Sequence, residues 1–307
     1  MKKVFVFLAA LLFTWTGSVE AQDNQLTAKE KKEGWVLLFN GKNLDGWTSV
    51  GKDVPPAFGW EIENGVMTVR KQDGKRGGDI ITRAQYSDFD LKVDFRITKG
   101  ANSGIKYFFT KYEKGGWLGL EYQIMDDENH PDGKLGRDGN RLEGGLYDMF
   151  PTSAKKVNPI GEWNQARIVA KGSKVTHYLN GKKILTFDRS SQLYKETWQL
   201  SKYKNCQPMF GDVEKGHILL QDHGDVVSFK NVKIRKLKYL KNKQRHEKYN
   251  NKKRLYQTSR RNGCGSDHRR YVVQSDQCQE LCEYYGFERT SEYGRYGNQW
   301  PWCRYGS

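Results

Sequence analysis

One nine-residue segment constrains the fold of this chain more than any other. In residues 89–97, five apolar residues at the odd positions alternate with four charged residues at the even positions. Successive side chains of a β-strand point to opposite faces, so this period of two indicates a strand. The segment is therefore predicted to bury one face against a core and to expose the other to water.

Several other segments have the same short, strand-like pattern. The strands expected from them are residues 165–170, 174–179, 183–187 and 227–234. Asn180-Gly181 separates two of these strands, and this dipeptide is the strongest short signal for a hairpin. A change of parity at Lys230-Asn231 indicates a β-bulge. Only residues 190–203 are expected to hold a short helix, so the chain is predicted to be all-β, as a two-sheet antiparallel sandwich.

The N-terminus has the layout of a secretory signal peptide. Two lysines precede the apolar run 4–12, and small residues at positions 19 and 21 suit cleavage after Ala21. The apolar run is too short for a membrane anchor. We therefore expect residues 1–21 to be removed, residues 22–33 to form a linker, and the mature protein to be secreted, most simply to the periplasm.

The composition changes at residue 238. Residues 238–307 hold 15 Lys and Arg against 7 Asp and Glu, with four of the five cysteines but only six Leu, Ile, Val or Phe residues. Three interpretations compete: a small module with two disulfides, a basic aromatic arm for nucleic acid or an acidic glycan, or translation out of the normal frame. The scarcity of apolar residues and the lack of periodicity favour a disordered or out-of-frame tail. The charge of +16 is then not evidence for a nucleic-acid partner.

Strand parity places a group of polar residues on one sheet surface. Three short segments carry them: 105–109, 120–125 and 218–223. The polar residues that share a face by parity are Lys106, Glu121, Gln123, Gln221 and His223. The same parity puts Lys106 beside Phe108. An acidic loop with His130 follows directly after Met125, and loops at strand ends are common places for binding and catalytic groups.

Each of these residues also has a structural explanation. Glu121 fits a solvated strand residue, and His130 before Pro131 fits a turn. The aspartates of the loop 126–133 fit either a solvated loop or the oxygen ligands of a calcium ion. Trp117 and Tyr147 fit either the core or a surface that stacks on sugar rings.

Several ordered motifs between residues 34 and 237 carry a family resemblance. They are Leu38-Phe39-Asn40-Gly41-Lys42-Asn43-Leu44-Asp45-Gly46-Trp47, Asn102-Ser103-Gly104-Ile105-Lys106-Tyr107, Glu121-Tyr122-Gln123-Ile124, Gly145-Leu146-Tyr147-Asp148, Gly161-Glu162-Trp163-Asn164, Leu220-Gln221-Asp222-His223-Gly224 and Phe229-Lys230-Asn231-Val232-Lys233-Ile234. With these motifs the chain resembles the 3-keto-disaccharide hydrolase family. The resemblance implies a concanavalin A-like jelly-roll sandwich and the cleavage of glycosides whose C3 hydroxyl is already a ketone.

The resemblance also implies roles for particular residues. The ketone makes the C2 proton acidic, so the protein needs a base, a group that stabilises charge on O3, and an acid for the leaving oxygen. Glu121 or His223 is expected to be the base, and Lys106 to stabilise the enolate unless a divalent cation does so. Tyr147 or His130 is expected to be the acid. The residues expected to bind the sugar are Gln123, Gln221 and Trp117. The alternative is a lectin-like sandwich that binds carbohydrate without cleaving it.

Overall fold

The computed structural model describes residues 22–153 and 155–237. The predicted signal peptide and the basic tail lie outside the described residues. In the part that is described, the regular structure is mostly β-strand joined by turns and loops, with two α-helices, α1 (Ala28–Lys32) and α2 (Gln192–Gln199), and one short 3-10 helix, Pro131–Lys134. None of the described helices is long and apolar enough to cross a membrane.

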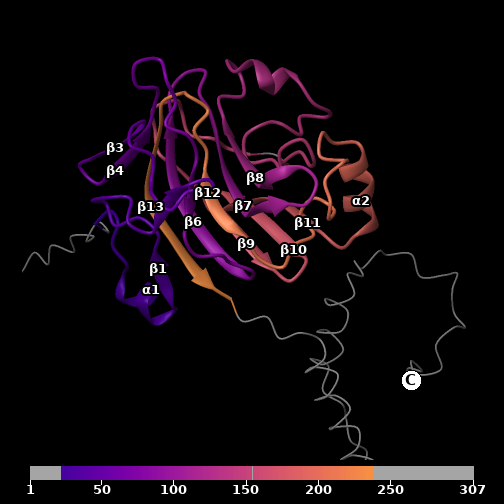
Figure 1. The fold of residues 1–307 in the computed structure, drawn as a ribbon, viewed down its shortest axis with the longest axis horizontal. Coiled ribbons are helices and arrows are strands. Elements are labelled where there is room, and N and C mark those ends of the chain that lie inside the picture. The colour runs from indigo at the N-terminus through magenta and orange to yellow at the C-terminus, as the bar shows by residue number, and fades with distance from the viewer. Residues whose placement is uncertain (1–21, 154, 238–307) are drawn as a thin grey trace, which may run out of the picture. The chain divides into compact units, whose positions relative to one another are not determined.

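Two antiparallel sheets form a jelly-roll-like sandwich, which confirms the predicted fold class (Figure 1). The eight-stranded sheet has the order β11-β10-β9-β6-β13-β4-β3, and β1 also pairs with β13. Its strands are β1 (Trp35–Leu37), β3 (Trp60–Glu63), β4 (Val66–Val69), β6 (Phe89–Ile97), β9 (Asn164–Lys171), β10 (Lys174–Leu179), β11 (Lys182–Asp188) and β13 (Val227–Lys236).

The second sheet has five strands in the order β2-β5-β12-β7-β8. These strands are β2 (Trp47–Ser49), β5 (Ile80–Thr82), β7 (Asn102–Tyr112), β8 (Gly116–Met125) and β12 (His217–Leu220). The expected strand at 89–97, the hairpin at Asn180-Gly181 and the irregularity in β13 are all present. The expected short helix is present as α2, which packs Tyr194 against Phe187 of β11.

The core lies between the two sheets. The odd residues of β6 are fully buried, and Phe89 packs edge-on against Tyr107 of β7 with the ring centroids 6.1 Å apart. His177 of β10 is buried beside them. Its Nε2 faces the Tyr107 hydroxyl at 2.7 Å and its Nδ1 faces the Gly144 carbonyl at 2.9 Å. Burial lowers the pKa of His177 to about 4, so its ring is neutral and connects both sheets at neutral pH.

A bulge in β7 changes which residues face the core. The register between β7 and β8 shifts between Tyr107 and Thr110, and Phe108 has a positive φ of 51°. Phe108 therefore turns into the core and packs on Phe89, while Phe109 moves to the outer face of the sheet. The expectation that Lys106 and Phe108 share a face is wrong, because the bulge breaks the period of two.

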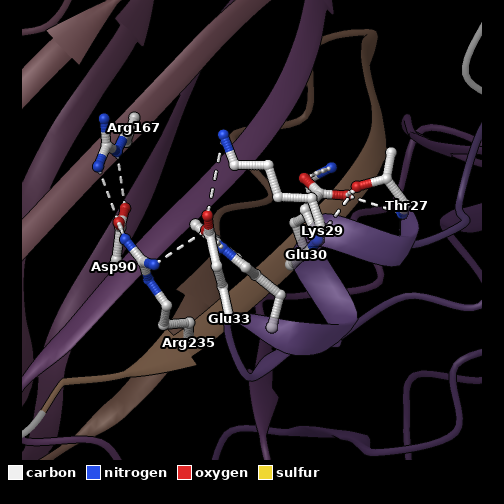
Figure 2. A network of polar contacts seen from close by, with 9 residues as sticks. Thr27, Lys29, Glu30, Glu33, Asp90, Arg167 and Arg235 are labelled. Carbon is white, nitrogen blue, oxygen red and sulfur yellow. Dashed lines mark hydrogen bonds and ion pairs between the residues drawn. The ribbon is translucent and has the colours of Figure 1, made fainter.

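On the outer side of the eight-stranded sheet, the buried carboxylate of Asp90 binds two arginine side chains (Figure 2). Asp90 is 1% exposed and accepts hydrogen bonds of 2.7 and 2.8 Å from Arg167 and of 2.8 Å from Arg235. Arg235 also reaches Glu33, directly after α1. The short helix α1 begins with a capping box between Thr27 and Glu30. A segment expected to be a linker thus contacts the last strand.

We predict that Asp90→Asn destabilises the fold by about 3 kcal/mol. The substitution removes the buried counter-charge of Arg167 and leaves Arg235 with Glu33 as its remaining partner, and breaking a buried ion pair costs about 3–5 kcal/mol. Equilibrium denaturation of the variant measures this loss. Glu61→Gln is the matched control, because the ion pair of Glu61 with Arg70 is about half exposed, and such pairs contribute about 0–1 kcal/mol. Equal losses in the two variants would contradict the prediction.

Candidate active site

The outer face of the five-stranded sheet carries the predicted polar residues. Lys106 of β7 lies opposite Glu121 of β8, and Gly104 lies opposite Gln123. The Gln221 amide, directly after β12, donates to the Gly104 carbonyl at 3.0 Å and continues the same row. Strand pairing therefore brings together residues that are far apart in the sequence.

Glu121 and Lys106 form an ion pair beside Gly104, which has no side chain. Lys106 Nζ lies 3.5 Å from Glu121 Oε2, and both side chains are largely buried. A Cβ atom on Gly104 would lie 2.5 Å from Glu121 Oε1. The carboxylate thus leans over Gly104, and only glycine leaves room for it there.

Tyr147 stands at the edge of this sheet. The segment 144–147 hydrogen bonds to the edge strand β8, with the Tyr147 amide on the Glu121 carbonyl at 3.0 Å. The Tyr147 hydroxyl donates to Asp132 Oδ2 at 2.7 Å, and Lys202 Nζ lies 4.2 Å from the centre of its ring. Burial and the bond to Asp132 raise the pKa of Tyr147, while burial lowers the pKa of Lys202.

His130 and His223 meet at the other end of the face. Their ring centroids lie 5.8 Å apart, and His223 Nδ1 lies 3.9 Å from Asp225 Oδ2. Within the described residues, these three are the group whose ligand atoms lie close enough together, within 4.8 Å, to hold a metal ion. However, His130 Nδ1 accepts a hydrogen bond from the Asp132 amide at 3.2 Å, so the neutral ring carries its proton on Nε2. A metal ligand normally donates from its other nitrogen, so His130 is arranged as a proton donor rather than as a ligand.

The acidic loop after β8 is held by protein donors. Asp126 accepts from the amides of Gly100, Glu128 and Asn129, and Asp127 pairs with Lys155. Asp132 pairs with Arg141 and accepts from Tyr147. The contacts of these carboxylates hold the loop in its conformation. This structural role accounts for the cluster of aspartates in the sequence.

Trp117 lies on the same strand as Glu121, four residues away and on the same side by parity. It is 37% exposed and stacks on Phe109, with ring centroids 5.6 Å apart. Phe109 belongs to a small apolar cluster with Ile81 and Leu219. The face therefore has a polar part around Glu121 and an apolar part around Trp117, at a distance of roughly 13 Å along the strand.

Asp79 is a carboxylate of this face that the sequence reasoning missed. It directly precedes the three-residue strand β5, which is too short to show a period. Its Oδ1 accepts from the Asp222 amide at 2.8 Å. Burial is the main cause that raises the pKa of Asp79, the negative charge of Asp222 adds to this, and the charge of Lys106 acts against it.

Two hollows in the described surface are relevant to the position of the site. One of about 350 Å³ is lined by Lys202 and Tyr203 and adjoins Tyr147. The larger one, of about 550 Å³, lies on the eight-stranded sheet beside Thr68 and Ser228. Thr68 and Ser228 hydrogen bond to each other at 3.0 Å. The larger hollow is therefore on a different sheet from the candidate active face.

Comparisons with known proteins agree with this architecture. A family model described as a 3-keto-alpha-glucoside-1,2-lyase-like domain matches residues 34–235. A 3-keto-disaccharide hydrolase of Bacteroides thetaiotaomicron is 34% identical over 246 residues, which cover 71% of this chain and 83% of that protein.

Two crystal structures of proposed glycosyl hydrolases from Parabacteroides distasonis are also similar. The first is 36% identical with a TM-score of 0.62, and the match covers 71% of this chain and all of that chain. The second is 29% identical with a TM-score of 0.52, and the match covers 66% and 99% of the two chains.

We predict that Glu143, which is buried beside the end of β8, makes the free energy of unfolding fall as the pH rises. It is fully buried, accepts from the Met125 amide at 2.8 Å, and has its pKa raised by burial to about 8. Between about pH 4.5 and 8 the unfolded chain releases a proton that the folded protein keeps. This lowers the free energy of unfolding by up to about 1.4 kcal/mol per pH unit.

Glu143→Gln removes this titration. Denaturation of both proteins between pH 5 and pH 8 measures the effect. The stability of the variant relative to the wild type should increase steadily over this range. Two parallel curves would show that Glu143 is already ionised in the folded protein.

Proposed function

Because this chain belongs to the 3-keto-alpha-glucoside-1,2-lyase-like family, we propose that it cleaves 3-keto-glycosides or 3-keto-disaccharides by elimination followed by hydration. The protein similar to it from Bacteroides thetaiotaomicron carries the name 3-keto-disaccharide hydrolase. The observation that carries the mechanism is the ion pair of Glu121 and Lys106 on the outer sheet face.

The reaction begins at C2 of the oxidised sugar. A base takes the C2 proton, and the electron pair moves to O3 as an enolate. The electrons then return, the bond between C1 and the glycosidic oxygen breaks, and a double bond forms between C1 and C2. Water adds at C1, and a proton returns to C2. The sum is hydrolysis, and no nucleophile needs to attack the anomeric carbon.

The geometry of Glu121 and Lys106 suits the first step. C2 and O3 are only two bonds apart, so the base and the group that stabilises the enolate must be neighbours. Glu121 Oε2 and Lys106 Nζ are 3.5 Å apart. Lys202 adds a second positive charge near Glu121. A fixed positive charge in a largely buried site stabilises a developing oxyanion strongly.

The other residues suit binding of the sugar. Gln123 and Gln221 each have a buried amide oxygen with no hydrogen-bond partner in the described structure, and sugar hydroxyls are suitable donors. His223 would orient the ring from the other end of the face. Tyr147 is a poor acid, because its proton is bonded to Asp132 and its pKa is raised. Among the residues expected from the sequence, His130 is the other candidate for protonating the leaving oxygen.

We also propose that the protein acts outside the cytoplasm, in the periplasm. The pattern of residues 1–21 supports this. An oxidised glycoside is the proposed partner, and Trp117 offers it an exposed aromatic surface.

We predict that the protein cleaves a 3-keto-glucoside and leaves the parent glucoside intact. Without the ketone, the C2 proton is not acidic enough for a carboxylate to remove. Product analysis with both sugars tests this. Deuterium at C2 should slow the cleavage or exchange into solvent. Equal cleavage of both sugars with full retention of deuterium would indicate an ordinary glycosidase, and binding without cleavage would indicate a lectin.

We further predict that Glu121→Gln and His223→Ala each lower turnover by at least about a hundredfold, the usual scale for a lost proton-transfer or positioning group. The melting temperature of His223→Ala should change little, because His223 is exposed. Glu121→Gln also removes the partner of the largely buried Lys106 and is expected to lower the melting temperature, so turnover is compared at a temperature at which both variants are folded. Glu61→Gln on the other sheet is the control and should keep its rate. Near-normal rates in both site variants would place the reaction elsewhere.

A further inference from the structure

We infer that Asp79 is the catalytic acid that protonates the leaving oxygen, in place of His130. This inference rests on the proposed function, because it concerns the same face and the same reaction. It adds a carboxylate that the sequence did not indicate and that would complete the set of groups required by the elimination.

The pairing of the strands places Asp79 on the active face. Ile80 lies opposite Leu220, and Leu220 lies opposite Ile105, so Asp79 extends the row of Gln221 and Gly104. Ile80 points into the main core, whereas Ile81 belongs to the apolar cluster of the outer face. Asp79 has the parity of Ile81 and therefore points outward.

The surroundings of Asp79 hold its carboxyl group in place but leave one oxygen free. The hydrogen bond that the described residues make to this side chain comes from the Asp222 amide to Oδ1. Asp222 is itself fixed, since it accepts from the amides of Gly78 and Gly224 at 2.8 and 2.9 Å. No described residue forms an ion pair with Asp79, whereas Glu121 is paired with Lys106.

The two carboxyl groups thus have different surroundings on one surface. Glu121 faces a cation, which suits a proton acceptor. Asp79 is largely desolvated beside the carboxylate of Asp222, and this burial raises its pKa against the opposing effects of the Asp222 amide, Lys106 and Arg76. Two carboxyl groups whose environments differ in this way are the usual basis of an acid and base pair.

The spacing leaves room for one sugar ring. Asp79 precedes β5 and Glu121 lies on β8, with two strands between them. Three gaps of about 4.8 Å give roughly 14 Å across the sheet, and Glu121 lies two residues, or about 7 Å, further along the strands than the row of Asp79. Glu121 leans inward over Gly104, so a pyranose ring on Gly104 and Gln221 would have C2 near one carboxyl group and the glycosidic oxygen near the other.

The proton balance closes over the two halves of the reaction. In the elimination, Glu121 takes the C2 proton and Asp79 gives its proton to the leaving oxygen. In the hydration, ionised Asp79 takes a proton from the water that adds to C1, and Glu121 returns its proton to C2. Both residues end in their starting states, and one water molecule is consumed.

Leaving-group dependence tests the inference. Asp79→Asn keeps an acceptor for the Asp222 amide but cannot donate a proton as an acid. We expect this variant to lose about a hundredfold in kcat on a 3-keto-disaccharide, whose alcohol leaving group needs a proton. On 4-nitrophenyl 3-keto-glucoside, whose phenolate leaves unaided, the loss should be less than about threefold. Glu121→Gln should lose activity on both substrates.

Two further variants complete the experiment. Asp45→Asn, at an exposed site outside the row, should match the wild type on both substrates. His130→Ala is the rival, and a loss confined to the disaccharide in this variant would overturn the inference. Equal losses of Asp79→Asn on both substrates, with a normal melting temperature, would also overturn it. Failure of the proposed function is distinct, since the wild type would then cleave neither oxidised substrate.

Discussion

His177 lies between the two sheets with both ring nitrogens engaged. One faces the Tyr107 hydroxyl of β7, and the other the carbonyl of Gly144. Gly144 begins the segment that hydrogen bonds along the edge of β8 and carries Tyr147. The ring must stay neutral for this arrangement, and its burial ensures that it does. A polar contact in the core thus fixes the position of residues 144–147, the segment that carries Tyr147 at the edge of the active face.

The active face itself depends on two local departures from a regular sheet. The bulge at Phe108 turns Phe109 outward, where it supports Trp117. Gly104 has no side chain, which lets the Glu121 carboxylate lie over the backbone. An ideal strand with a side chain at every position would fill this surface. The chemistry is therefore made possible by places where the regular pattern is interrupted.

Sequence reasoning found the features that follow from hydrophobic periodicity. The strand 89–97 and the hairpin at Asn180-Gly181 are recognisable because burial and turn chemistry act locally. The placement of Lys106 and Glu121 on one face is expected from parity within each strand together with the family resemblance, and the pairing of β7 with β8 brings them opposite each other. The orientation of Phe108 does not follow from parity, since one positive φ reverses it. Asp79 also could not be placed, because its position comes from long-range pairing of a three-residue strand, which leaves no local pattern.

The last strand of the described residues, β13, occupies a central place in its sheet. β13 lies between β6 and β4 and also pairs with β1, near the start of the described chain. During synthesis the eight-stranded sheet cannot close until residue 236 is available. Until then, β6 and β4 expose unpaired edges that can associate with other chains. Closure of this sheet therefore depends on pairing between residues far apart in the sequence, and such long-range closure is intrinsically slow.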